Sequence, residues 1–301
     1  MSWWNLPEGL RAQVTAALGA APVSEEIQTG GFSPGVASRL TLVDGRRVFV
    51  KAISPARNPV APDLYRRELS VMRRMPEHLP VPRLLWAQDD GDWVILAMEC
   101  IDGRMPEEPW SPDELDRVVG AVDELAAALS PAPMRLRPLV EDLAENYTAW
   151  RTFAERGADP ALPSWAVRNV GLLAALEAGW TRAAAGESMV HSDLRADNLL
   201  LTSDGGVSVV DWSYAVAGAP WFDLLTLLVS AAATGTDPQR EWEKADVARG
   251  AGENEVNAVL AAMAGDYLSS SLLPAPSNMP GLRAHQGEKG RAALIWLRHR
   301  L

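Results

Sequence analysis

Apolar and polar residues alternate through much of the N-terminal third of the chain, which is the pattern of half-buried β-strands. The expected strands cover 24–30, 37–43, Arg47–Ile53, 84–88 and 93–98. Asp44 and Gly45 form a turn pair that joins the second strand to the third. Where apolar residues recur every three or four positions, helices are predicted at 6–20 and at 63–75, the latter with Asp63 as its N-cap.

The pattern becomes helical after Gly103. Ser111, followed by Pro112 and then Glu114, predicts a capped helix that runs to about residue 129. Further helices are expected at 138–157, 164–185 and across most of 220–301, and a pair of short strands at 198–202 and 206–210. The sequence therefore predicts an α+β, bilobal fold: a small β-rich lobe over 1–98, a link over 99–103 and a larger, mainly helical lobe over 104–301.

Composition and charge narrow the functional classes. The chain has 301 residues with 48% hydrophobic and 22% charged residues, which is typical of a globular protein. Its net charge of −11 repels phosphate backbones, so no nucleic-acid partner is expected. Cys100 is the single cysteine and the four histidines lack zinc spacing. The N-terminus lacks the pattern of a signal peptide and the window 219–234 is too short to span a membrane, so a soluble cytoplasmic protein of open oligomeric state is expected.

Polar residues gather between two apolar runs in the segment 191–198, with the sequence HSDLRADN. Asp211 ends the next apolar run, thirteen residues after Asn198. Oxygen ligands such as those of Asn198 and Asp211 suit Mg²⁺, which leaves Asp193 to accept a proton from an attacking hydroxyl. This spacing is typical of the catalytic loop H-x-D-x-x-x-x-N with a later metal-binding aspartate, as in kinase-like phosphoryl transfer. A polar loop with no catalytic role is the alternative for the segment taken alone.

The same residues resemble the aminoglycoside phosphotransferase family of kinase-like enzymes. The family's hallmarks match the segment 191–198, the run 209–212 with the sequence VVDW, and the run 218–224 with the sequence GAPWFDL. The resemblance covers nearly the whole chain in the right order. It implies a protein-kinase-like fold, ATP or alternatively GTP as the phosphoryl donor, and Mg²⁺ as the metal. By the same resemblance, Asp223 braces the catalytic loop.

Two further residues of the catalytic loop have expected roles. Arg195 could neutralise charge on the transferring phosphoryl group, although a surface role is the alternative. His191 is expected to orient the loop through a hydrogen bond, so that Asp193 remains the base.

Lys51 lies at the end of the third expected strand, in the sequence VFVKAI, and resembles the kinase lysine that binds the α- and β-phosphates. Glu68 follows seventeen residues later inside a predicted helix and is the expected ion-pair partner. The alternative is that Glu68 only balances the neighbouring Arg66 and Arg67.

Two more segments are expected to bind the nucleotide. Gly30, Gly31, Ser33 and Gly35 lie between the first two strands, where backbone N–H groups could approach phosphate oxygens, although an ordinary hairpin turn is the alternative. By resemblance, the adenine would bond to the carbonyl of Glu99 and the N–H of Ile101. Met98 would pack behind it.

The sequence thus predicts a Mg²⁺- and ATP-dependent kinase of a small-molecule hydroxyl, an aminoglycoside or another antibiotic being one class of acceptor. A metabolite kinase of the choline, homoserine or sugar type is the alternative, and a nucleotide-binding pseudokinase is a third. A protein kinase is disfavoured because Asp223 follows Asp211 by only twelve residues. Carboxylates of the helical lobe could bind acceptor amino groups or could be solvated; they are Glu141, Asp142, Glu145, Glu241, Glu243 and Asp246.

Overall fold

The computed structural model describes residues 1–28, 35–58, 61–276 and 279–301, and its contacts divide the chain into two compact units. Unit 1 comprises residues 1–105 together with 197–215, and unit 2 comprises 106–196 together with 216–301. The segment 197–215, which the sequence places in the helical lobe, thus groups with the N-terminal part of the chain. The lobe boundaries proposed above, at 98 and 104, stay a prediction.

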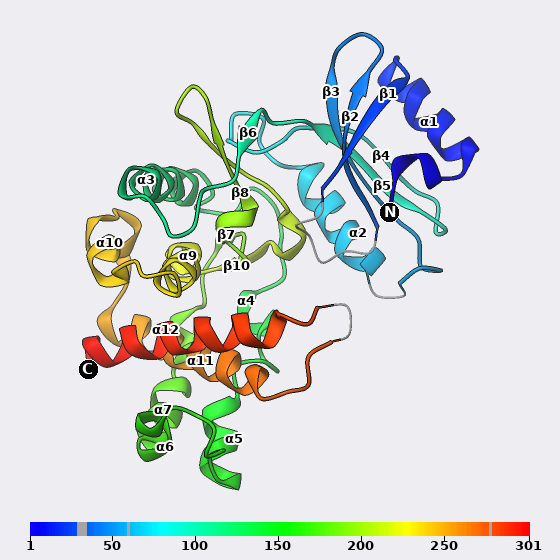
Figure 1. Cartoon of the computed structure of the whole chain (residues 1–301). Helices are drawn as coiled ribbons and strands as arrows, with labels where there is room; N and C mark the ends of the chain where they lie inside the picture. The colour runs from blue at the N-terminus through cyan, green and yellow to red at the C-terminus, as the bar shows by residue number, and fades with distance from the viewer. Residues whose placement is uncertain (29–34, 59–60, 277–278) are drawn as a thin grey trace. The chain divides into compact units, whose positions relative to one another are not determined.

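Unit 1 is built on a five-stranded antiparallel sheet in the order β1-β2-β3-β5-β4. The strands are β1 (Pro22–Ile27), β2 (Val36–Leu42), β3 (Arg47–Ile53), β4 (Leu84–Asp89) and β5 (Val94–Glu99). The helices α1 (Glu8–Leu18) and α2 (Ala61–Met72) lie on the two sides of this sheet (Figure 1). Because side chains alternate along a strand, Val48 and Val50 of β3 join α1 in one core cluster, while Phe49 and Lys51 take the opposite face.

A short hairpin completes unit 1. It pairs β8 (Leu199–Thr202) with β9 (Val207–Val209), and β6 (Gly103–Arg104) pairs with the outer side of β8. The chain then forms the 3-10 turn η3 (Trp212–Tyr214), which packs against α2. A preceding 3-10 turn, η2 (Ala196–Asn198), leads into β8.

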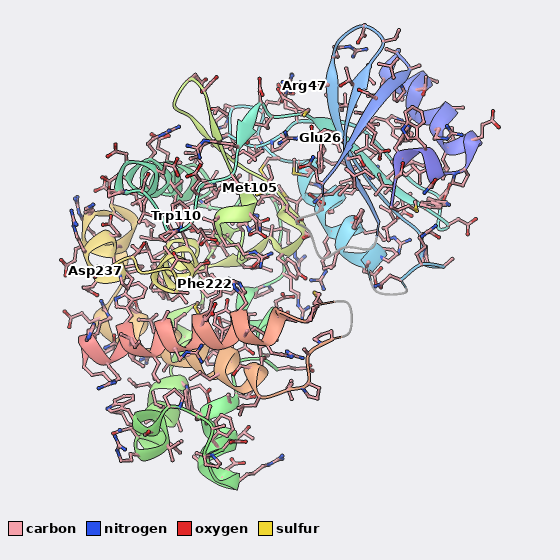
Figure 2. The ribbon with its side chains drawn as sticks, viewed as in Figure 1. Glu26, Arg47, Met105, Trp110, Phe222 and Asp237 are labelled. Carbon is pink, nitrogen blue, oxygen red and sulfur yellow. The ribbon has the colours of Figure 1, made fainter. Side chains whose placement is uncertain are left out.

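Unit 2 is mainly helical. Its longer helices are α3 (Pro112–Ala128), α9 (Phe222–Ala232), α11 (Glu253–Ser271) and α12 (Leu282–Arg300). The shorter ones are α4 (Leu139–Asp142), α5 (Ala149–Arg156), α6 (Ser164–Arg168), α7 (Val170–Glu177), α8 (Trp180–Ala183), α10 (Pro238–Lys244) and the 3-10 turn η4 (Val247–Gly250). Two short strands, β7 (Ser188–Val190) and β10 (Val216–Gly218), pair antiparallel. Phe222 lies among the side chains of the interior, whereas Asp237, which caps α10, lies at the margin of the unit (Figure 2).

Several sequence expectations are confirmed and others are wrong. The third strand, Arg47–Ile53, has the predicted bounds, and Ser111 caps α3 by accepting the N–H of Glu114 at 3.3 Å. Asp63 is not an N-cap, because α2 begins two residues earlier, at Ala61, and Asp63 lies in its first turn. The short strands β6, β7 and β10 were not predicted, since two- and three-residue pairings leave no period in the sequence.

The expected helix over 138–157 is broken between α4 and α5. The buried carboxylate of Glu177, far along the chain on α7, accepts the backbone N–H groups of Trp150 and Arg151, each at 3.0 Å. This contact satisfies the first N–H groups of α5 and therefore starts a new helix there. The expected helix over 164–185 is likewise divided, into α6, α7 and α8.

Among the residues that the structure describes, no helix is long and apolar enough to cross a membrane.

Candidate active site

Lys51 is the central cation of a charge cluster in unit 1. Its Nζ atom lies 2.8 and 2.9 Å from the carboxylate oxygens of Glu68, which α2 presents to this face of the sheet. The side chain of Lys51 is 12% exposed and that of Glu68 is 2% exposed. The ion pair that the sequence predicts is therefore formed, and it is shielded from water.

Asp211 supplies the second carboxylate of this cluster. Its Oδ1 atom accepts Lys51 Nζ at 2.9 Å and the hydroxyl of Ser213 at 2.9 Å. Burial alone would lower the pKa of Lys51, but the charges of Glu68 and Asp211 outweigh burial and raise that pKa above its ordinary value. Lys51 is thus held as a permanent cation.

Asn198 lies close to Asp211 along the hairpin of β8 and β9. Leu199 pairs with Val209, and the carbonyl of Asn198 accepts the N–H of Val210 at 3.0 Å. This register places Asn198 and Asp211 at the same end of the hairpin. Hairpin pairing, which the sequence predicts, is therefore what brings the two proposed metal ligands together.

The donor set fits a magnesium ion that keeps water and phosphate ligands. No group of three or more histidine, cysteine, aspartate or glutamate side chains in the described parts of the chain could hold a metal. The side chain of Asp211 is 45% exposed, and it offers carboxylate oxygen, the ligand that Mg²⁺ prefers. Mg²⁺ is commonly held by one or two protein oxygens together with the phosphates of a nucleotide, which is what Asp211 and Asn198 could provide.

The predicted catalytic loop in unit 2 is braced by a buried aspartate. Asp223, in the first turn of α9, accepts the backbone N–H groups of His191 at 2.7 Å and Ser192 at 2.8 Å. Burial raises the pKa of Asp223, and these two hydrogen bonds oppose the rise. Ser192 has a φ of 61°, so the loop turns sharply just before Asp193. Asp223 thus fixes the turn, as the family resemblance implies.

Asp193 and Arg195 follow this turn as a charged pair. The backbone N–H of Asp193 donates to Nδ1 of His191 at 3.3 Å, and the His191 side chain is buried. The role of His191 in orienting the loop stays a prediction. Arg195 Nε lies 3.8 Å from Asp193 Oδ2, and the side chain of Asp193 is 39% exposed. A carboxylate that is accessible yet held in place suits a residue that accepts a proton from a ligand.

Tyr267 on α11 was not found from the sequence. Burial raises its pKa above the ordinary value, and the charges of Asp193 and Asp266 raise it further, whereas Arg195 lowers it. Tyr267 therefore lies within electrostatic reach of the catalytic loop. No local motif marks it, because it reaches the loop from a helix more than seventy residues downstream of Asp193.

The glycine-rich segment is only partly described. Gly30, Gly31 and Ser33 lie outside the described residues. At Gly35, a Cβ atom would lie 2.4 Å from the carbonyl oxygen of Ala52, so the close approach to β3 by itself requires glycine there. A phosphate-binding role for this segment stays a prediction.

The segment that links the expected lobes is ordered within unit 1. Met98 is buried on β5 opposite Phe49, on the sheet face that also carries Lys51. Glu99 pairs with Val48 and its carboxylate accepts Arg83 Nε at 3.1 Å. Ile101 lies between β5 and β6. Adenine binding by Met98, Glu99 and Ile101 stays a prediction.

Two of the candidate carboxylates of the helical part form ion pairs within unit 2. Asp142 pairs with Arg137 at 3.0 Å and Glu241 with Lys244 at 2.8 Å. Asp266, which the sequence did not single out, lies on α11 beside Tyr267. Burial raises the pKa of Asp266 to about 6, although hydrogen bonds from Asn146 and Ser270 act to lower it.

Solved structures of other proteins are similar to this chain in fold. Among solved structures, choline kinase LicA from Streptococcus pneumoniae has a TM-score of 0.60 at 11% identity, over 97% of this chain and 98% of its own. Aminoglycoside phosphotransferase APH(3″)-Id from Streptomyces rimosus, in complex with ADP and streptomycin, has a TM-score of 0.51 at 20% identity, over 85% and 98% of the two chains. Amicoumacin kinase hAmiN, in complex with AMP-PNP, Ca²⁺ and Ami, has a TM-score of 0.55 at 10% identity, over 95% and 94%.

These likenesses confirm the predicted α+β, kinase-like fold, with an antiparallel sheet in the N-terminal part and helices in the C-terminal part. No curated protein sequence matches the chain. The model of the phosphotransferase enzyme family APH matches residues 30–264, which is most of the chain. The chain therefore belongs to the APH phosphotransferase family.

Proposed function

We propose that this phosphotransferase moves the γ-phosphoryl group of ATP to a hydroxyl of a small molecule, with Mg²⁺ as its metal. The observation that carries the proposal is the ammonium of Lys51, buried and held by both Glu68 and Asp211. A cation fixed in this way suits the phosphates of a nucleotide, because phosphoryl transfer depends mostly on positioning and charge stabilisation. The similar structures with AMP-PNP, with ADP and with small antibiotics support this reading.

Residues of the Lys51 cluster and of the segment 191–198 then each have a role in phosphoryl transfer. Lys51 would bind phosphate oxygens, and Asp211 with Asn198 would hold the metal. Bound Mg²⁺ and ATP would supply the phosphoryl group and offset its negative charge. Asp193 would accept the proton that the acceptor hydroxyl loses, and Arg195 would balance charge beside it. His191 and Asp223 would keep the loop in the shape that this proton transfer needs.

The acceptor belongs to one of two classes, antibiotics or metabolites. We propose an aminoglycoside or another antibiotic, since the similar structures include an aminoglycoside phosphotransferase with streptomycin and an amicoumacin kinase with Ami. Choline-, homoserine- and sugar-type metabolites form the second class, which the likeness to a choline kinase favours. ATP is the expected donor, GTP the alternative, and the cytoplasm the expected location.

A coupled assay of ADP release against a panel of both acceptor classes tests the proposal. With an active acceptor in hand, Asp193→Asn should lower kcat by about 10²- to 10⁴-fold, the usual contribution of a general base. Its affinity for Mg·ATP should stay close to that of the wild type, since Asp193 is not part of the Lys51 cluster. Asp92→Asn, at an exposed turn, is the matched control. Full activity of Asp193→Asn would exclude Asp193 as the base.

A further inference from the structure

Ser213 is a buried hydroxyl that contacts the proposed metal ligand directly. Its Oγ atom donates to Asp211 Oδ1 at 2.9 Å, and Lys51 Nζ reaches the same oxygen at 2.9 Å. A carboxylate oxygen has about two lone pairs for such donors, so these two hydrogen bonds use the capacity of Oδ1.

The turn that carries Ser213 is rigidly anchored. Asp211 adopts a left-handed backbone, with φ and ψ both 64°, which sends the chain back into η3. Trp212 is fully buried there, and its indole N–H donates to the carbonyl of Val209 at 3.1 Å. Within this turn the hydroxyl of Ser213, two residues after Asp211, lies within hydrogen-bond distance of the carboxylate. Ser213 itself is 7% exposed, so water competes little for this hydrogen bond.

Lys51 cannot fix the orientation of the Asp211 carboxylate in place of this hydroxyl. Its ammonium is shared with both oxygens of Glu68 and, under the proposed function, with the phosphates of the nucleotide. Ser213 is neutral, lies two residues from Asp211 in the same turn and donates its hydroxyl hydrogen bond to Asp211. It can keep the carboxylate in one rotation when the ammonium also binds phosphate.

We propose that Ser213 is a positioning residue for the divalent cation: its hydroxyl fixes the rotation of the Asp211 carboxylate and so sets the affinity of this site for metal. The inference rests on the proposed function, because it takes Asp211 as a metal ligand. Ser213 does not need to contact the metal directly in this role.

Binding of Mn²⁺ in the presence of a non-hydrolysable ATP analogue, followed by electron paramagnetic resonance of the free ion, tests the inference. Ser213→Ala should weaken Mn²⁺ binding by about threefold to tenfold, the usual range for one neutral hydrogen bond. Binding of the analogue in EDTA should stay unchanged. In turnover, the KM for Mg²⁺ should rise by a similar factor, while kcat at saturating metal stays near the wild-type value.

Three variants separate the hydroxyl from simple packing. Ser213→Thr keeps the hydroxyl and should restore Mn²⁺ affinity, whereas Ser213→Cys keeps the volume, offers only a weak donor and should behave like Ser213→Ala. Ser208→Ala is the matched control, because Ser208 on β9 is equally buried and its Oγ has no hydrogen-bond partner among the described residues. It should bind Mn²⁺ like the wild type. If Ser213→Ala does not fold, the Cys and Thr variants still decide the question.

The possible outcomes distinguish this inference from the proposed function. If Asp211→Asn loses Mn²⁺ while the Ala and Cys variants bind it normally, Ser213 has no positioning role and the proposed function stands. If Ser208→Ala weakens Mn²⁺ binding as much as Ser213→Ala does, packing is the cause and the inference is wrong. If the wild type binds no Mn²⁺ with the analogue, both fail.

Discussion

Lys51 is a buried ammonium whose charge depends on two carboxylates from distant parts of the chain. Glu68 is 1% exposed, so removal of the cation would leave its buried negative charge without the ammonium of Lys51. Breaking a buried ion pair from one side is strongly unfavourable, because the remaining charge keeps its desolvation penalty without the attraction that offset it. The cluster therefore contributes to stability as well as to the proposed chemistry.

Lys51→Met should accordingly lower the free energy of unfolding by about 3–5 kcal/mol, measured by urea denaturation. The double variant Lys51→Met with Glu68→Gln should recover a large part of this loss, since the buried negative charge of Glu68 is then removed as well. Equal losses in the single and double variants would show that the charge of Glu68 is not the cause.

Asp266 gives the folded state a dependence on pH. Burial raises its pKa to about 6, above the value near 4 that an aspartate has in an unfolded chain. Between these two values the folded state binds the proton that the unfolded state loses, so this residue makes the protein less stable as pH rises from about 4 to about 6 and adds no slope above that.

Asp266→Asn should abolish this slope. The free energy of unfolding of the variant, relative to that of the wild type, should increase by roughly 2 kcal/mol between about pH 4 and pH 7. Urea titrations at several pH values measure the difference, and parallel pH profiles for the two proteins would contradict it. Tyr147 and Tyr267 lie nearby, but burial raises the pKa of both phenols, so neither titrates in this range.

The helices α11 and α12 of unit 2 approach each other closely at a glycine, Gly290. α11 and α12 pack side by side (Figure 1), and a Cβ atom at Gly290 would lie 2.9 Å from the backbone nitrogen of Leu268 and 2.7 Å from its Cγ. These distances are too short for a methyl group unless a helix moves. The sequence of α12 alone contains one further glycine, Gly287, and offers no sign of which of the two is more constrained.

Gly290→Ala should therefore destabilise the protein by about 1–3 kcal/mol, despite the higher helix propensity of alanine, because overpacking outweighs it. Gly120→Ala in α3 is the matched control, since nothing lies within 4 Å of a Cβ atom there. This exposed variant should gain up to about 1 kcal/mol. Thermal and urea unfolding of the two variants give the comparison, and stabilisation by Gly290→Ala would show that the helices can adjust.

At the scale of the whole molecule, unit 1 is discontinuous along the chain. Residues 1–105 supply the sheet and both of its helices, while 197–215 supply Asp211, the partner strand of β6 and the turn η3 that packs on α2. Without residues 197–215, the segment 1–105 therefore leaves one face of α2 and the ammonium of Lys51 incompletely covered.

A fragment of residues 1–105 should unfold without cooperativity or at a much lower urea concentration than the full chain. Joining 197–215 to this fragment through a flexible linker should restore a cooperative transition, because the hairpin and η3 then cover α2. Circular dichroism during urea denaturation measures both fragments. A cooperative, equally stable transition in residues 1–105 alone would show that the hairpin is dispensable.

Local sequence patterns determined much of the fold and of the site. The period of two in Arg47–Ile53 fixes the strand and puts Lys51 on the face opposite the α1 core, whatever the rest of the chain does. The spacing of Asp193, Asn198 and Asp211 predicts a catalytic loop and metal ligands, because such chemistry requires given residue types at short separations; these roles stay predictions. The family and the kinase-like fold followed from these motifs.

Tertiary structure alone decided the contacts between residues far apart in the chain. Glu177 divides a predicted helix by accepting N–H groups of α5, and the charges of Asp193 and Arg195 influence the pKa of Tyr267 on α11. Neither interaction leaves a local period in the sequence, since each depends on how whole helices pack. Ser213 is the intermediate case: its place two residues after Asp211 is visible in the sequence, but its hydrogen bond needs the left-handed turn and the buried indole of Trp212. The sequence thus determined which groups the site contains, and packing determined how they are held.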